Sequence, residues 1–142
     1  NIRKENFMRL KKVIPFFVLT FLLSCSGDPK LSENPNTTFK DFRMFLLKNF
    51  SGLTLDSINE INENDIEMLG ASAGAGFSNG DDLNIEAYLF DEKKKVKKAE
   101  NTLAETLKAF DLDPPECLVS GYFLICNADE GDFKSKGLLS KF

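Results

Sequence analysis

The feature that most constrains this chain is a short apolar run near its start, bounded by basic residues and a cysteine. Residues 13–23 are almost all apolar, and Ser24 and Cys25 follow them. About eleven residues are too few for a helix that crosses a bilayer, which needs about 20. Three basic residues lie just before the run: Arg9, Lys11 and Lys12. This pattern is typical of a secretory signal with a small-residue cleavage site, so we expect residues 1–24 to lie outside the folded domain.

The end of this segment, Leu22-Leu23-Ser24-Cys25, resembles the lipobox of bacterial lipoproteins. The resemblance covers residues 8–25 only. It implies that the thiol of Cys25 is acylated, that the chain is cut before Cys25, and that the new amino terminus is a lipid anchor in a membrane. Ser26, rather than Asp, follows the cysteine. The resemblance therefore implies the outer membrane or the cell surface.

Met8 directly precedes the basic residues and is the expected translation start, so residues 1–7 are interpreted as upstream read-through and are not expected to belong to the fold.

The alternative for residues 13–23 is a core helix of the domain beside an incidental cysteine. In that case the basic flank, the length of the run and the terminal Ser-Cys would all be coincidental.

The mature chain, residues 25–142, is strongly acidic. Five of the 18 Lys and Arg residues and one of the 22 Asp and Glu residues lie in residues 1–24, which leaves the mature chain with a net charge of −8. Nucleic acid would repel such a chain, so we expect no nucleic-acid partner. The sequence contains no His, which is the commonest metal ligand and the usual acid–base group near pH 7. We expect no cofactor and no metal site.

With Cys25 assigned to lipid, two cysteines remain, and they fit a disulfide. Cys117 and Cys126 flank a segment that can form a hairpin, with Gly121-Tyr122 as a two-residue loop of type II′. Hydrogen-bonded and non-hydrogen-bonded pairs alternate away from such a turn, beginning with a hydrogen-bonded one. This alternation pairs Cys117 with Cys126 at a non-hydrogen-bonded site, where the side chains are closest. An exported compartment permits such a bond. The alternative is two separate buried thiols.

Residues 25–37 are predicted to be the lipidated cysteine and a flexible tether, and residues 38–142 a single domain. The tether is polar and contains two prolines. A helix is expected from Thr37 or Thr38 to Ser51-Gly52, because Phe39, Phe42, Leu46 and Phe50 recur at steps of three and four. The pattern in residues 53–66 is ambiguous and allows a short helix capped by Asp56.

The second half of the chain alternates strand and helix patterns. Residues 71–78 and 83–90 alternate like the strands of a hairpin around Asn79-Gly80, and the small residues of the first strand would let a helix approach closely. Residues 91–110 have a clear helical pattern, with Asp91 as the expected cap. Its apolar stripe comprises Val96, Ala99, Leu103, Leu107 and Phe110. With a short terminal helix, the order predicts an α+β fold: a small antiparallel sheet of two hairpins, covered on one face by helices.

Two weaker motifs each have a structural alternative. The Gly-rich residues 70–76 match neither phosphate-loop pattern, so a tightly packed strand is predicted instead. Asp81-Asp82 could offer hard oxygen ligands to calcium, but the EF-hand spacing is missing and a hairpin turn is predicted.

Five lysines gather at the start of the predicted helix over residues 91–110. They are Lys93, Lys94, Lys95, Lys97 and Lys98. Basic side chains in a first turn oppose the helix dipole, which favours acidic ones there. The cluster is therefore a candidate patch for an anionic partner, and a solvated helix face is the alternative that we prefer.

No nucleophile lies in a recognisable catalytic motif, because neither GxSxG nor SxxK occurs. We predict no catalytic residue. The leading hypothesis is a lipid-anchored protein of the bacterial cell envelope with a non-enzymatic binding domain for an unknown envelope macromolecule. The alternative is a small enzyme that uses carboxylates on an envelope polymer. A structural or stress-induced lipoprotein without a specific ligand is the third hypothesis.

Overall fold

The fold is taken from a computed structural model, which describes residues 30–80, 82–129 and 132–142. The helical segments are η1 (Leu31–Glu33), α1 (Phe39–Asn49), η2 (Leu55–Ser57), α2 (Glu63–Leu69), α3 (Lys93–Ala109) and α4 (Lys136–Leu139). The strands are β1 (Ile58–Glu60), β2 (Ala73–Ser78), β3 (Asn84–Leu89), β4 (Cys117–Ser120) and β5 (Phe123–Asn127). The predicted α+β class is confirmed.

The strands form one antiparallel sheet of five strands in the order β1-β2-β3-β5-β4. Both predicted hairpins, β2–β3 and β4–β5, are present and are joined along β3 and β5. β5 is therefore an interior strand, and all five of its residues are buried. A continuous apolar run such as its Phe-Leu-Ile-Cys is typical of a strand covered on both faces.

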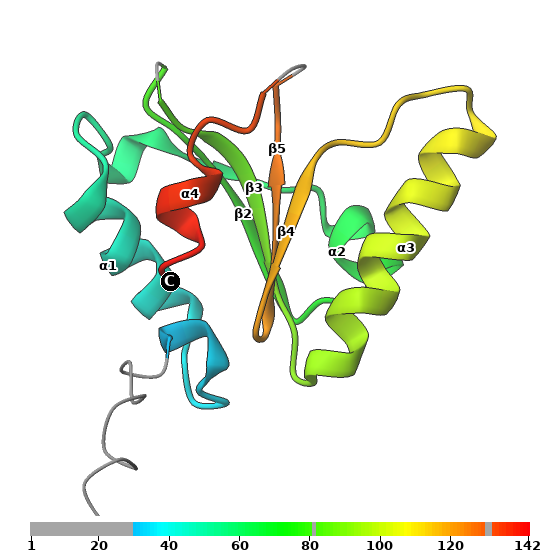
Figure 1. The fold of residues 1–142 in the computed structure, drawn as a ribbon, viewed down its shortest axis with the longest axis horizontal. Helices are drawn as coiled ribbons and strands as arrows, with labels where there is room; N and C mark the ends of the chain where they lie inside the picture. Colours follow the sequence, from blue (N-terminus) through cyan, green and yellow to red (C-terminus); the bar gives the residue numbers. More distant parts are fainter. Residues whose placement is uncertain (1–29, 81, 130–131) are drawn as a thin grey trace, which may run out of the picture.

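Helices cover both faces of the sheet, whereas the sequence predicted cover on one face only. α1 and α4 lie on one side and α2 and α3 on the other (Figure 1). The reason is visible in β3. Ile85 and Ala87 face the first layer of helices, while Tyr88 faces the second, and all three are buried. Both sets of alternating side chains are thus excluded from water.

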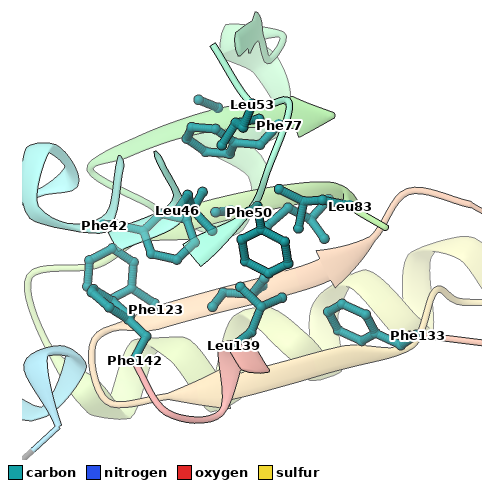
Figure 2. Packing of buried hydrophobic residues seen from close by; sticks show 14 residues of the cluster. Phe42, Leu46, Phe50, Leu53, Phe77, Leu83, Phe123, Phe133, Leu139 and Phe142 are labelled. Atoms are coloured by element: carbon teal, nitrogen blue, oxygen red, sulfur yellow. The ribbon is translucent and has the colours of Figure 1, made fainter. Parts of the chain in front are cut away.

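The core between the sheet and the α1/α4 layer is rich in phenylalanine (Figure 2). Phe42 of α1 is fully buried and lies at its centre. Its ring centroid is 5.6 Å from that of Phe77, 5.4 Å from that of Phe123 and 4.9 Å from that of Phe142. Tilted and edge-on ring pairs at such distances add to the stabilisation from buried area.

α1 begins where the sequence predicted. The Thr38 hydroxyl accepts from the Asp41 N–H, and the Asp41 carboxylate accepts from the Thr38 N–H at 2.7 Å, which completes a capping box. These bonds satisfy two backbone donors that a helix start leaves without partners. The Thr38 hydroxyl also donates to the Asp41 carboxylate at 2.8 Å. The bonds that the carboxylate accepts, first from the Thr38 backbone N–H and then from its hydroxyl, lower the pKa of Asp41 below its usual 3.8.

α3 differs from the prediction in its cap and in its apolar stripe. Its N-cap is Glu92, without a side-chain capping bond, and not Asp91. Asp91 instead pairs with Lys95 one turn later. Within the stripe, Val96 is fully buried but Phe110 is 72% exposed, so the end of the helix extends beyond the sheet.

Residues 53–66 form more structure than the predicted short helix capped by Asp56. η2 leads into the short edge strand β1. A separate helix, α2, is capped by Asn62, whose side chain accepts from the Asn64 N–H. α2 approaches β2 closely at Gly74, where an added Cβ would lie 3.3 Å from Ile66. The predicted close approach of a helix to the small-residue strand is therefore present at Gly74.

Candidate functional site

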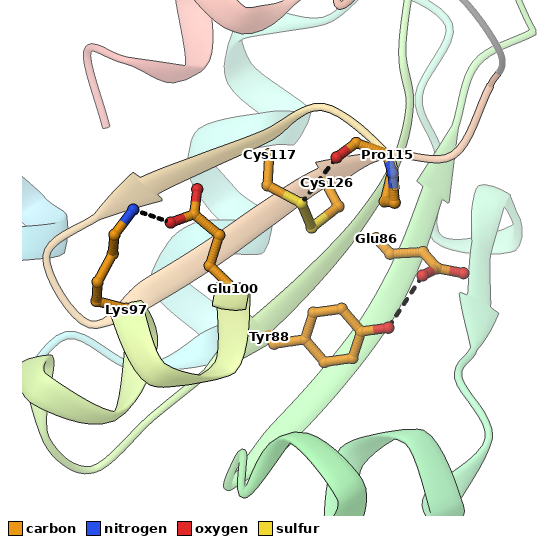
Figure 3. The surroundings of a disulfide bond; sticks show 7 residues. All are labelled: Glu86, Tyr88, Lys97, Glu100, Pro115, Cys117 and Cys126. Atoms are coloured by element: carbon orange, nitrogen blue, oxygen red, sulfur yellow. Dashed lines mark hydrogen bonds and ion pairs between the residues drawn. A yellow bond between two sulfur atoms is a disulfide. The ribbon is translucent and has the colours of Figure 1, made fainter. Parts of the chain in front are cut away.

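The β4–β5 hairpin has the predicted register. Ser120 pairs with Phe123 across Gly121-Tyr122, and Cys117 pairs with Cys126, with their Cα atoms 4.0 Å apart. Asn127 donates its N–H to the Glu116 carbonyl, which places the cysteines at a non-hydrogen-bonded site. The two sulfur atoms are bonded, as the sequence predicted (Figure 3). The disulfide lies in the core between the sheet and α3, where Cys126 is buried.

The structure docks residues 31–37 on the domain, although the sequence predicted a flexible tether through residue 37. Ser32 is fully buried at the turn of the β4–β5 hairpin. Its N–H donates to the Phe142 carbonyl at 2.9 Å, and its carbonyl accepts from the Tyr122 N–H at 3.0 Å. Its hydroxyl lies 2.8 Å from that of Ser120. The position of η1 is therefore fixed by both the hairpin turn and the carboxyl-terminal residue.

The close approach of η1 depends on Gly121. Its φ angle is +55°, and a Cβ there would lie 1.9 Å from the Ser32 carbonyl oxygen. Only glycine adopts this conformation readily while leaving room for the neighbouring chain. The sequence identified Gly121 as a turn residue, but it carried no signal of the partner segment.

Carboxylates accompany the lysine cluster. Lys93 pairs with Glu33 of η1, and Lys97 pairs with Glu100. Lys95 lies 2.8 Å from Asp91, and that hydrogen bond is the main cause of a raised pKa for Lys95 and a lowered pKa for Asp91. Lys94 lies 2.5 Å from Glu92.

Among the described residues, Lys98 alone of the five lysines has no carboxylate within ion-pair distance. The patch is therefore a mixed-charge surface rather than a bare cationic one. This arrangement fits the solvated-face interpretation better than that of an anion-binding site, because the pairs are exposed and exposed pairs are weak.

Tyr88 and Glu86 form a polar pair on the face of the sheet that holds the disulfide (Figure 3). The Tyr88 hydroxyl donates to Glu86 at 2.9 Å. Burial raises the pKa of Tyr88 above its usual value, and the Glu86 carboxylate raises it further. Tyr88 therefore remains protonated near neutral pH and acts as a hydrogen-bond donor. This pair was not predicted from the sequence, although residues two apart on a strand share one face.

The opposite end of the sheet from η1 carries a polar hollow of about 490 Å³. It lies where β2 ends, β3 begins and β5 ends. We call it the polar hollow; its side chains come mainly from Ser78, Asp82, Asn84, Asn127, Asp129, Asp132, Lys134 and Ser135. Asn84 donates to the Asp129 carboxylate at 2.5 Å, and Asn127 donates to the Asp129 carbonyl at 2.9 Å. The hollow thus offers hydrogen-bonding groups of both kinds around a fixed aspartate.

The Gly-rich segment leads into strand β2, and the Asp81-Asp82 pair follows that strand in the sequence. Gly70 ends α2 in the left-handed conformation and β2 follows it, so residues 70–76 form a helix end and a strand rather than a phosphate loop. Asp82 donates its N–H to the Asn79 side chain within the β2–β3 turn, whereas residue 81 lies outside the described residues. No cluster of three His, Cys, Asp or Glu side chains suited to a metal ion occurs in the part of the chain that the structure describes.

The predicted lipidation site, Cys25, also lies outside the described residues. Within residues 30–80, 82–129 and 132–142, no helix has both the length and the apolar character needed to cross a bilayer. Comparison with known proteins gave no match to a family model, to a curated sequence or to a solved structure.

Proposed function

We propose that this protein is exported, anchored in the bacterial cell envelope by lipid on Cys25, and binds another envelope macromolecule through its folded domain without catalysing a reaction. Three features support export and anchoring. The basic and apolar segment ends in the lipobox-like Leu-Leu-Ser-Cys, and the domain carries a disulfide, which is rare in reducing compartments. The docked η1 segment is only six residues from Cys25.

The binding role is supported by one observation: the point where the chain enters the domain and the polar hollow lie at opposite ends of the sheet. The chain enters at η1, which lies against the β4–β5 turn, whereas the polar hollow lies at the other end of β3 and β5. Six residues of β3 separate these ends by about 20 Å. An anchor at the first end therefore presents the polar hollow away from the membrane, where a partner can reach it.

Affinity capture from envelope extract tests this role. The mature domain should retain a partner that a variant with Asp82→Asn and Asp132→Asn loses, because both side chains line the polar hollow. The matched control combines Lys93→Gln, Lys94→Gln and Lys95→Gln at the opposite end. Equal capture by all three proteins would contradict binding at the polar hollow.

One observation favours the alternative of an envelope-polymer enzyme. Three aspartates, Asp82, Asp129 and Asp132, line the polar hollow, and paired carboxylates are the usual catalytic groups of glycosidases. Release of soluble fragments from purified envelope polysaccharide by the wild type, but not by the Asp82→Asn/Asp132→Asn variant, would favour the enzyme over the binding role.

A further inference from the structure

We propose that the domain rests on the bilayer that holds its anchor, through an apolar hollow beside α1 and η1. This inference rests on the proposed anchoring at Cys25 and adds the orientation of the domain. The hollow has a volume of about 690 Å³, and apolar side chains provide most of its lining. Its apolar lining residues are Leu31, Met44, Phe45 and Leu47, and its polar ones are Asp41, Lys48 and Asn49.

The length of chain between the anchor and the domain limits what can cover this hollow. Leu31 follows Cys25 by six positions, so the chain between these two residues spans at most about 21 Å, whatever its conformation. Acyl chains on Cys25 would hold that residue at the boundary of the hydrocarbon layer. Leu31 lines the hollow directly, and Ser32 beside it is fixed to the domain. The hollow is therefore confined close to the lipid headgroups.

The exposure of two side chains indicates which side of this end faces the lipid. Leu31 is 49% exposed and Met44 is 58% exposed, although both are large and apolar. Partial burial of such side chains in the headgroup region is favourable. Because the anchor raises the local concentration of the surface, even a weak contact is populated.

The lysine cluster does not provide an equivalent electrostatic contact. The mature chain has a net charge of −8, and Lys93, Lys94 and Lys95 of the lysine cluster are paired with Glu33, Glu92 and Asp91. The proposed contact is apolar, so it should form on zwitterionic lipid and persist as salt is raised. A contact through the lysine cluster would behave in the opposite way.

Tryptophan fluorescence provides the test, because the sequence contains no Trp and an introduced one is the sole reporter. Met44→Trp places the reporter in the hollow. Phe110→Trp is the matched control, since Phe110 is 72% exposed and follows α3 at the end away from η1. Both variants are made in the full chain, exported, purified in detergent and reconstituted into phosphatidylcholine vesicles with or without brominated acyl chains.

We expect brominated lipid to quench Met44→Trp at least about twofold more than Phe110→Trp, at low and at high salt. Leu31→Trp serves as a second reporter of the same hollow and should be quenched likewise. Equal or absent quenching of the hollow reporters in acylated, vesicle-bound protein overturns the orientation alone. A blue shift of the hollow reporters that grows with protein density, without quenching by brominated lipid, indicates that a second copy fills the hollow and also overturns it. Absence of acyl groups from Cys25 overturns the anchoring and this inference together.

Discussion

Gly121 lies so close to Ser32 that a Cβ atom at position 121 would stand 1.9 Å from the Ser32 carbonyl oxygen. Two residues that are 89 positions apart in the sequence are thus in close backbone contact. The contact is accompanied by the hydrogen bond from the Tyr122 N–H to Ser32 and by the buried pair of Ser32 and Ser120 hydroxyls. It sets the point at which the chain from the anchor joins the domain.

Gly121→Ala should therefore destabilise the protein and release η1. The added methyl group must displace backbone atoms of Ser32, and the positive φ adds strain, so we expect a loss of roughly 2 kcal/mol or more in the free energy of unfolding. Urea unfolding measures this loss, and limited proteolysis should cut residues 31–37 more readily. Gly70→Ala is the matched control, because Gly70 has a φ of +69° but no atom within 4 Å of the added Cβ. Equal losses for the two variants would show that the contact with Ser32 is unimportant.

The disulfide should stabilise the domain by a limited amount. Cys117 and Cys126 are nine positions apart, and the chain-entropy model gives about 3 kcal/mol for a closed loop of this size. We expect the Cys117→Ser/Cys126→Ser protein to lose up to that amount in urea unfolding, while Cys25→Ser loses nothing. Peptide mapping of the exported protein without reductant provides a second check. Two freely alkylated thiols in the native protein would refute the disulfide.

The β4–β5 hairpin is the part of the fold that its local sequence determines most fully. A two-residue turn fixes the register of the strands on either side of it. This local rule pairs Cys117 with Cys126, and the structure has that register. η1 and β1 were missed because each has three residues, too few to show a period. Burial of Ser32 depends on Gly121 and Phe142, which are distant in sequence. No local pattern encodes such a contact.

The apolar sequence of β5 already indicates that helices cover both faces of the sheet. Phe123, Leu124 and Ile125 are consecutive and fully buried, which requires cover on both faces of β5. The polar hollow could not be predicted in the same way. Its residues come from two stretches that are distant in sequence, 78–84 and 127–135, and polar side chains at strand ends are common in loops that bind nothing.

Changing the lysine cluster should affect the fold little. Lys93→Gln, Lys94→Gln and Lys95→Gln together remove exposed ion pairs and also relieve an unfavourable interaction with the helix dipole. We expect almost the same melting temperature as the wild type and the same partners at low and high salt. Loss of a partner at low salt only, with an unchanged melting temperature, would show instead that the lysines bind an anionic envelope component.

The capping box makes stability depend on pH through Asp41. Because the folded state lowers the pKa of Asp41 below 3.8, its contribution to stability is fully present above that pH and is lost as the pH falls through the folded value. The difference in stability between the wild type and Asp41→Asn should shrink as the pH is lowered from 5 towards 2.

Nuclear magnetic resonance titration of the Asp41 carboxyl checks the cause directly. Thr38→Val removes the hydroxyl but keeps the backbone N–H, so the pKa of Asp41 should return only part of the way towards 3.8. Loss of the cap should also cost about 1 kcal/mol of stability. A pKa of Asp41 at its ordinary value in the wild type would contradict the capping box.

Acylation of Cys25 is the central claim, and labelled fatty acid tests it most directly. The full chain, expressed and exported in a bacterial host, should incorporate labelled fatty acid and fractionate with membranes. Mass spectrometry should find an amino-terminal peptide that begins at an acylated Cys25. The Cys117→Ser/Cys126→Ser control should label like the wild type, whereas Cys25→Ser should not label. Equal labelling of Cys25→Ser, or an unmodified Cys25 in the exported wild type, would contradict the account.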